Sequence, residues 1–529
     1  MRDIQSPGRS VVMAAGAMVA TSQPMATAVA LQILENGGNA MDAAVAASAT
    51  LSVTEPLSTG IGGDCFLLYH EAATGKLHAL NGSGRAPGRA TPAAVRARNS
   101  GMLPERGILS VTVPGAVDAW QTAVERFGNC DFGALLEPAI HYAECGFVVS
   151  PVIAGTWKNH EQLFRQSADS ARSMLLDGRA PAAGSRHCFP DLARSLRLIA
   201  SQGKDVFYRG AVAEEIIRFS HEHKGLLELD DLASHRCEWV EPISRDYRGL
   251  TVCEVPPNAQ GISTLMLLGI LEQARLEKLQ YLGPAHIHLF VEAFKLAQAE
   301  AARHVADPAF SDVPVEALLS GRFAQQQYAR IDPGVALGFP VLPVMPQHRD
   351  TVYLTVVDKD RNIVSFINSL YHAGGSGMVA GSTGILLQNR GACFVLDEHH
   401  NNCIAPGKRP LHTIIPAMAY REGKPVLSFG VMGGSYQPLG QACVLSNWLD
   451  FRMDIQEAID APRFHVEDGV LRVERPIPRV TREALTRLGH QVLESETPLG
   501  GAQMIYIDHL HGVLHGGSDP RKDGCALGY

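Results

Sequence analysis

A threonine at the start of a predicted β-hairpin is the first candidate for chemistry. Thr351 opens the run TVYLTVVD, in which Thr, Val and Tyr favour a strand. A polar turn over residues 358–362 follows, and Ile363–Leu370 is predicted to return as a second strand. A hydroxyl is a weak nucleophile until a neighbouring base takes its proton. Considered alone, Thr351 is therefore better explained as an ordinary strand residue.

A pair of glycines further along could serve the same kind of chemistry. Val426–Gly430 is predicted as a strand and Leu439–Leu449 as a helix, so Gly433 and Gly434 lie at a strand-to-helix turn. Such a turn can present backbone N–H groups outward, as the stabilisation of a tetrahedral oxyanion requires. A tight turn with no catalytic role can have the same composition.

Several motifs, in order along the chain, resemble the gamma-glutamyltransferase family of N-terminal-nucleophile (Ntn) hydrolases. They lie between about Gly16 and Tyr529 and include GGNAMDAAVA, STGIGGD, GKLHALNGSGRAP, the hairpin at 348–371 and the ending GGSDPRKDGCALGY. The STGIGGD turn is not a phosphate loop, because no GK[ST] follows and it leads from a helix to a strand. We expect it to allow packing and close backbone approach.

The resemblance implies that the chain cleaves itself between Asp350 and Thr351, giving a large subunit, 1–350, and a small subunit, 351–529. The two subunits would form a heterodimer, with a higher oligomer possible. The new α-amino group, with a pKa of about 7.7–8.0, would then act as base for the hydroxyl of the same residue. By the same resemblance Ser369 supplies a second hydroxyl that hydrogen-bonds the nucleophile, and the Gly433-Gly434 pair forms the oxyanion hole.

The fold that the resemblance implies is α+β: a four-layer αββα sandwich with two central antiparallel sheets, one carrying Thr351, and helices on both outer faces. Both subunits are expected to interleave in one domain. Local patterns add helices at Met25–Leu34, Ala40–Ser52 and Gly283–Val305. We expect residues 130–330 to be mainly helical, Ile385–Leu387 to be a strand, and Pro333–Pro346 to be an exposed linker.

The amino-acid composition limits the kinds of partner that this protein could bind. Hydrophobic residues make up 46 % and charged residues 19 %, as in a soluble globular protein. A formal net charge of −8 without a basic run argues against nucleic acid and anionic membranes, and no stretch resembles a membrane-spanning helix. Ten scattered cysteines form no CxxC pair and no zinc spacing, and they suit a reducing compartment. We therefore expect a cytoplasmic enzyme with no metal and no cofactor.

The positions that hold a glutamyl group in the family are changed in this chain. A family asparagine is Tyr371 here, a glutamine and an aspartate are Arg390 and Cys393, and two paired serines are His412 and Thr413. The family aspartate pairs with the ammonium of a glutamyl substrate, which a neutral thiol cannot do. Arg390 would oppose an ammonium and favour a carboxylate.

These changes favour a small anionic amide without an α-amino group. Oxamate, an amide joined directly to a carboxylate, fits, and oxamate amidohydrolases are one branch of the family. Its carboxylate would pair with Arg390 while Thr351 attacks the amide carbon and ammonia leaves. Arg85 is a further candidate ligand or a surface charge, because ungapped counting places Ser83 where the family has its carboxylate-binding arginine.

Other functions remain open on the sequence alone. A gamma-glutamyl hydrolase or transferase could hold glutathione in a different way, and an acylase could take a bulky amide, because the interval Cys393–Pro406 is short beside the lid-bearing loops of many family members. The joint presence of Thr351, Ser369 and the two glycines argues against an inactive binding protein. Adjacent histidines in a polar loop are usually solvated, which argues against a metal site. The ligands of such a site would be Asp397, His399, His400 and His412.

Overall fold

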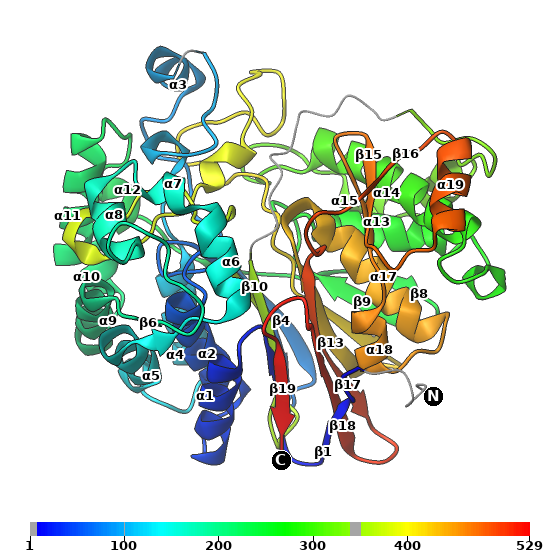
Figure 1. Ribbon diagram of the computed structural model, residues 1–529, viewed down its shortest axis with the longest axis horizontal. Helices are drawn as coiled ribbons and strands as arrows, with labels where there is room; N and C mark the ends of the chain where they lie inside the picture. The colour runs from blue at the N-terminus through cyan, green and yellow to red at the C-terminus, as the bar shows by residue number, and fades with distance from the viewer. Residues whose placement is uncertain (1–7, 100, 339–350) are drawn as a thin grey trace.

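Among the described residues, two antiparallel sheets of seven strands each lie face to face (Figure 1). The structure is a computed structural model that describes residues 8–99, 101–338 and 351–529. In spatial order, sheet A contains β1 (Val12–Ala14), β18 (Val513–Ser518), β17 (Gly501–Asp508), β13 (Lys424–Met432), β12 (Ala417–Arg421), β9 (Leu250–Glu254) and β8 (Ile243–Tyr247). Sheet B contains β19 (Cys525–Gly528), β2 (Met18–Thr21), β10 (Val352–Val357), β11 (Ile363–Ser369), β3 (Asp64–Glu71), β4 (Lys76–Gly82) and β7 (Glu238–Val240). Each sheet takes strands from both sides of residue 350.

Helices cover the outer face of each sheet. Sheet B packs against α1 (Pro24–Glu35) and α2 (Ala40–Thr54). Sheet A packs against α13 (Gly261–Leu271), α14 (Pro284–His304) and α17 (Gln437–Leu449). Because successive side chains of a strand point to opposite faces, Val352 and Leu354 join the helix-covered core, whereas Tyr353 joins a third core between the sheets. These layers confirm the predicted αββα sandwich.

The remaining elements surround the four layers. The other helices are α3 (Pro92–Arg98), α4 (Ala116–Phe127), α5 (Phe132–Cys145), α6 (Pro151–Asn159), α7 (Glu161–Phe164), α8 (Ala168–Met174), α9 (Pro190–Gln202), α10 (Asp205–Tyr208), α11 (Ala211–Glu222), α12 (Leu229–Ala233), α15 (Val315–Leu318), α16 (Gly321–Tyr328), α18 (Ile455–Asp460) and α19 (Arg479–Arg487). Two small sheets contain β14 (Phe464–Glu467), β15 (Val470–Val473) and β16 (Gln491–Glu494), and β5 (Phe147–Val148) with β6 (Arg186–His187). Within the described ranges, no helix has both the length and the apolar character needed to cross a membrane.

Helix α2 positions the β10–β11 hairpin. The helix is wholly buried, and its alanine-rich surface allows close packing on the two strands. Asn39 caps its first turn by accepting hydrogen bonds from the N–H groups of Met41 and Asp42. The N–H of Ala40 donates to Asp358 Oδ2 at 3.0 Å. The hairpin turn is thereby attached to the N-terminus of α2.

Most of the local predictions are confirmed. The expected hairpin is β10 with β11, and the helices expected at 25–34, 40–52 and 283–305 are α1, α2 and α14. Of the predicted linker, Pro333, Gly334 and Val335 are exposed, while residues 339–346 lie outside the described part of the chain.

One local prediction is wrong. Ile385–Leu387 is not a strand and makes only an isolated bridge, between Val379 and Leu386, because glycine-rich turns before it and the 3₁₀ turn Arg390–Cys393 after it leave it no long neighbour. The segment 130–330 is mainly helical, as predicted, and also contains the strands β5 to β9. Strand β9 is stabilised by pairing with the distant β12, and a local pattern cannot reveal such a pairing.

Candidate active site

The register of the hairpin brings two hydroxyl groups together. Val352 of β10 pairs with Asn368 of β11, so the next residue outward on each side is Thr351 and Ser369. Their oxygens lie 3.0 Å apart, and both side chains are buried. Thr351 thus lies directly beside the second hydroxyl that the sequence predicted for it.

The glycine-rich STGIGGD turn packs behind these hydroxyls. A Cβ on Gly63 would lie 2.4 Å from the carbonyl oxygen of Ser369, and a Cβ on Gly62 would lie 2.2 Å from that of Leu386. Only glycine permits such close approach of two backbones. The interpretation of this turn as a packing element is therefore supported by its contacts.

Contacts across the sandwich place Thr351 near the other glycine turn. Two contacts join β10 to β13: Thr355 with Ser428, whose hydroxyl oxygens are 2.6 Å apart, and Tyr353 with Gly430, where a Cβ would lie 2.4 Å from the ring. From the first contact to the second, the residue number falls by two in β10 and rises by two in β13. The same progression places Thr351 opposite Met432, the residue before Gly433.

Gly433 and Gly434 form the turn between β13 and α17 with φ angles of +136° and +60°, which favour glycine. The carbonyl of Gly433 accepts from the N–H of Tyr436, and that of Gly434 accepts from the Gln260 side chain at 3.0 Å. In a trans peptide the N–H points away from the C=O. The N–H of Gly434 is therefore directed away from α17, as an oxyanion donor must be.

Arg390 is a buried cation with two donor atoms left over. Its side chain is 0 % exposed, and its Cζ lies 4.3 Å from the ring centre of Tyr371. Nη1 donates to Thr413 Oγ1 at 2.8 Å and lies 3.9 Å from Cys393 Sγ. Nε and Nη2 donate to no group in the described ranges, and Arg390 forms no ion pair with any described carboxylate. A buried guanidinium in this state is suited to a bidentate anion.

Tyr371 connects this cation to the hydroxyl pair. Its N–H donates to Ser369 Oγ at 2.8 Å, while its ring lies against Arg390. Its φ angle is +80°, an unfavourable value for a residue with a large side chain. Strained residues of this kind cluster at functional sites, where the surrounding structure holds them.

His412 faces Asp64, a partner that the sequence did not reveal. His412 Nε2 and Asp64 Oδ2 are 3.0 Å apart, and both side chains are fully buried. Burial, together with the charge of Arg390, lowers the pKa of His412 to about 3 despite the carboxylate. Burial alone would raise the pKa of Asp64, but the hydrogen bond from His412, the positive charge of Arg390 and the hydrogen bond from Gln388 outweigh it, and the pKa is lowered. The imidazole is thus neutral and the carboxylate charged at neutral pH.

Sequence reasoning missed Asp64 and Gln260. Asp64 Oδ1 also accepts from Gly84 N–H, Gly115 N–H and the Gln388 side chain. Asp64 is the last residue of the STGIGGD motif, so that motif was an available signal. Gln260 donates both to Gly434 and, at 2.6 Å, to the carbonyl of Thr413, and it lies in none of the motifs.

Two predicted residues lie apart from this group or cannot be placed. Arg85 donates to Glu238 Oε1 at 2.7 Å and to the carbonyl of Gly407, so it has protein partners of its own. Its contact with substrate stays a prediction. Asp350 lies outside the described residues, so the peptide bond before Thr351 is not described.

The disfavoured metal site does not form. His399 and Asp397 lie in a loop, with His399 exposed, while His412 is committed to Asp64. Within the described ranges, one other set could hold an ion by its spacing: His288, Glu292 and His490. There the ammonium of Lys295 already lies 2.7 Å from Glu292 Oε1, so this buried cluster has a cation of its own.

Comparisons with known proteins identify the family of the chain. Residues 26–529 match the gamma-glutamyltranspeptidase family. The chain is 39 % identical over 523 residues to a glutathione hydrolase-like YwrD proenzyme of Bacillus subtilis (strain 168), covering 97 % of this chain and 98 % of that one. It is 35 % identical over 528 residues to the oxamate amidohydrolase proenzyme of Klebsiella pneumoniae, covering 97 % of this chain and 98 % of that one.

A solved structure extends the likeness to three dimensions. The cephalosporin acylase from Bacillus halodurans superposes with a TM-score of 0.93 at 42 % identity, covering 100 % of this chain and 99 % of that one. The chain belongs to the gamma-glutamyltranspeptidase family and is an autoprocessed Ntn hydrolase acting on amides.

Proposed function

We propose that this enzyme hydrolyses a small amide whose acyl part carries a carboxylate, with oxamate, giving oxalate and ammonia, as the leading substrate. The observation that carries the proposal is the buried Arg390 guanidinium, whose Nε and Nη2 have no acceptor among the described residues. A carboxylate matches these two donors in geometry and charge.

The proposed nucleophile is the hydroxyl of Thr351 after cleavage of the Asp350–Thr351 bond. The freed α-amino group takes the hydroxyl proton, and Ser369, 3.0 Å away, orients the oxygen. Oγ1 attacks the amide carbon, and negative charge develops on the oxygen beside the Gly433-Gly434 turn. Ammonia leaves with the proton, and water then opens the ester to release oxalate.

We assign binding of the substrate carboxylate to Arg390. The ring of Tyr371 packs against its guanidinium, and Thr413 Oγ1 accepts a hydrogen bond from its Nη1, so both residues hold it in place. His412 contributes indirectly, because its Nε2 already faces Asp64. Arg85 is kept only as a weaker candidate, since Glu238 pairs with it.

The same pocket is poorly suited to an ammonium. The two carboxylate oxygens of Asp64 already accept four hydrogen bonds. Burial raises the pKa of the Cys393 thiol, so it stays neutral near pH 7 even beside Arg390. The α-amino group of a glutamyl substrate would therefore have no acidic partner at the position of Cys393.

A second candidate is a gamma-glutamyl hydrolase or transferase acting on glutathione. The 39 % identity to a protein named glutathione hydrolase-like favours it. The α-carboxylate of a glutamyl group could also pair with Arg390, while its ammonium would need a contact outside the changed positions.

A comparison of kcat/KM for three substrates separates the two candidate functions. Purified protein is first shown on a denaturing gel to be cleaved, with the small fragment beginning TVYLTVVD. Oxalate or glutamate release is then measured for oxamate, glutamine and glutathione. We expect the highest kcat/KM for oxamate. A higher value for glutathione or glutamine would reject oxamate in favour of the second candidate.

Two further expectations belong with this proposal. The cleaved fragments 1–350 and 351–529 are proposed to remain together as a heterodimer, because each central sheet contains strands from both. A cytoplasmic location is also proposed, on the basis of the ten free cysteines.

A further inference from the structure

Gln260 is a buried side chain that contacts two separate parts of the proposed site. It lies at the N-terminal end of α13 and is 1 % exposed. Its Nε2 donates to the carbonyl of Thr413 at 2.6 Å and to the carbonyl of Gly434 at 3.0 Å. An amide nitrogen carries two hydrogens, so these two acceptors use both of them. One side chain therefore holds two backbone segments at once.

The main chain of Gln260 is attached to one of these segments as well. Its N–H donates to the carbonyl of His412 at 2.9 Å, and the N–H of His412 donates to the carbonyl of Asn258 at 2.9 Å. His412, the residue before Thr413, thus forms a bridge with the turn that leads into α13. The backbone of Gln260 is therefore fixed relative to Thr413, and its side chain extends that fixed position to Gly434.

Gly434 needs such support because it has no side chain to limit its rotation. The peptide before its Cα is held through the carbonyl of Gly433, which accepts from the N–H of Tyr436 at 3.1 Å. The peptide after its Cα is held through its own carbonyl, which accepts from Gln260. Glycine rotates readily about both of its backbone bonds. Loss of the Gln260 contact would therefore allow the proposed oxyanion donor, the N–H of Gly434, to change direction.

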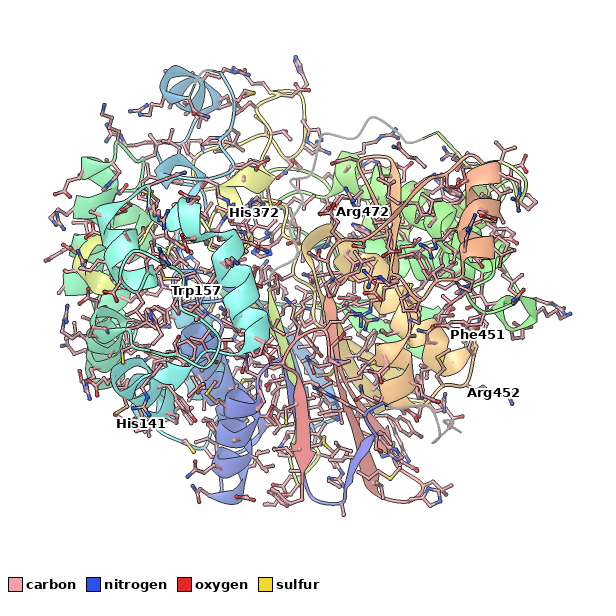
Figure 2. All side chains as sticks on the ribbon, viewed as in Figure 1. His141, Trp157, His372, Phe451, Arg452 and Arg472 are labelled. Atoms are coloured by element: carbon pink, nitrogen blue, oxygen red, sulfur yellow. The ribbon has the colours of Figure 1, made fainter. Side chains whose placement is uncertain are left out.

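Thr413 connects Gln260 to the anion site. Its Oγ1 accepts from Arg390 Nη1 at 2.8 Å, while its carbonyl accepts from Gln260. The ring of Tyr371 lies against the same guanidinium. Figure 2 labels the next residue, His372, in the left half of the view, whereas α13 and α17 lie in the right half of Figure 1. The contacts from Arg390 through Thr413 to Gln260 therefore connect the two halves of the molecule.

We infer that Gln260 is a positioning residue that fixes the oxyanion donor of Gly434 relative to the carboxylate-binding Arg390. It acts through the carbonyls of Gly434 and Thr413 and not on the substrate itself. The spacing of the two sites has to match the spacing of the carbonyl oxygen and the carboxylate in the substrate, and a displacement of about 1 Å can cost about 10²-fold in rate. This inference rests on the proposed function for the roles of Arg390 and the glycine turn.

A second buried glutamine provides the matched control. Gln441 of α17 is 0 % exposed, and its Nε2 donates to the carbonyl of Ile415 at 2.9 Å, two residues beyond Thr413. Its Oε1 accepts from the hydroxyl of Thr264 at 3.0 Å. Gln441 thus supports the same segment as Gln260, but its hydrogen bonds within the described ranges do not reach the glycine turn.

Gln260→Met tests the inference, because methionine has a similar length and no N–H donor. Cleavage before Thr351 is checked on a denaturing gel, and the cleaved enzyme is assayed. We expect kcat for oxamate to fall about tenfold or more, because the oxyanion donor is no longer held in place. The ratio of kcat/KM for oxamate to that for oxamide should fall about threefold or more, because Arg390 is displaced with Thr413. Gln441→Met should leave both values within about twofold of the wild type.

Both variants should have a lower melting temperature, because each leaves a buried carbonyl without its donor. Equal kinetic changes in Gln260→Met and Gln441→Met would overturn the inference and leave Gln260 with a structural role alone. A fall in kcat with the wild-type ratio, or the reverse, would overturn the shared positioning of the two sites.

Two substitutions keep the test decisive. If Gln260→Met gives no cleaved enzyme, Gln260→Asn takes its place, because its side chain is one methylene too short to reach both carbonyls, and the same two values decide. If the wild-type enzyme hydrolyses glutamine and not oxamate, the proposed function fails. Glutamine and its α-amide then replace oxamate and oxamide, and the inference stands or falls by the same comparison with Gln441→Met.

Discussion

Two buried arginines in this molecule have opposite surroundings. Arg463 is 3 % exposed; its Nη2 lies 2.5 Å from Asp519 Oδ2, and its guanidinium also donates to the carbonyls of Leu499 and Ile459. Arg390 is 0 % exposed, and its hydrogen bond partners in the described ranges are the Thr413 hydroxyl and, at 3.9 Å, the Cys393 sulfur.

The difference distinguishes a structural ion pair from a binding site. A buried charge is stable when its hydrogen bonds and counter-charge are supplied by the protein, as they are for Arg463. Arg390 forms no such ion pair within the described residues: the charge of Asp64 acts on it without a direct contact, and a bound carboxylate would pair with Nε and Nη2. We propose that recognition depends on a few changed side chains, while the hairpin and the glycine turn supply the groups for attack.

Thr351→Ala gives the largest expected effect and separates binding at Arg390 from turnover. Turnover should fall about 10⁴-fold or more, the scale seen when a hydrolase nucleophile is removed, and the protein should stay one chain on a denaturing gel. Oxamate should still raise the melting temperature, because Arg390 is unchanged. Residual self-cleavage in this variant would exclude Thr351 as the nucleophile for processing.

Gly434→Ala should cut turnover of oxamate by about 10²–10³-fold, the usual effect of losing one oxyanion donor. Its φ of +60° is unfavourable for alanine, so the turn that directs the N–H will shift. Thermal stabilisation by oxamate should persist in the cleaved variant. Near-normal turnover would remove this turn from the mechanism.

Arg390→Gln tests the anion site directly. Losing a hydrogen-bonded charge pair should lower kcat/KM for oxamate about 10–150-fold. Oxamide, which is neutral, should be much less affected, and Arg390→Lys should recover only part of the loss because the planar fork is absent. Equal losses on oxamate and oxamide would reject the anion site.

Arg463→Met is the structural counterpart. It leaves Asp519 buried without its partner, so the free energy of unfolding should fall by about 3–5 kcal/mol in denaturant titrations. The ratio of kcat/KM for oxamate to that for oxamide should stay at the wild-type value. A change in that ratio without loss of stability would contradict the structural role of Arg463.

The last expected effect is on the pH dependence of stability. The pKa of His412 is about 3 in the folded protein and about 6.5 when unfolded, because burial disfavours its charged form. Between pH 6.5 and 3 the unfolded chain binds a proton that the folded chain does not. Stability should therefore fall as pH falls, by at most about 1.4 kcal/mol per pH unit from this group.

His412→Asn should flatten this acid limb and also impair turnover. His286, whose pKa burial lowers to about 4, is the matched control, because His286→Phe should flatten the limb without changing turnover. An unchanged acid limb in His412→Asn would mean that this histidine is not held neutral.

Local features of the site were predictable from the sequence. The resemblance implied that Ser369 lies beside Thr351, and the pairing of β10 with β11 places the two residues opposite one another. The glycine pair implied a turn between β13 and α17. Arg390 at a position where the family has a neutral residue implied a preference for anions, which follows from charge alone.

Contacts between distant segments could not be predicted in this way. The pairing of His412 with Asp64 joins residues 348 positions apart, and Gln260 reaches Gly434 across 174. Strand β9, which forms a local hairpin with β8, also pairs with the distant β12. In each case the partner is chosen by how the layers stack, and no periodicity within one segment records that choice.

The amino-acid sequence by itself determined the hairpin that begins at Thr351, the glycine turn and the positive charge of the proposed recognition pocket, since these depend on residue type and short-range spacing. Only the tertiary structure decided that Arg390 is buried with two donors that meet no acceptor in the described part of the chain, that His412 is neutral beside Asp64, and that a cleft opens beside Gly500. Burial and desolvation arise when separate segments pack together. They decide which side chains remain available to a substrate.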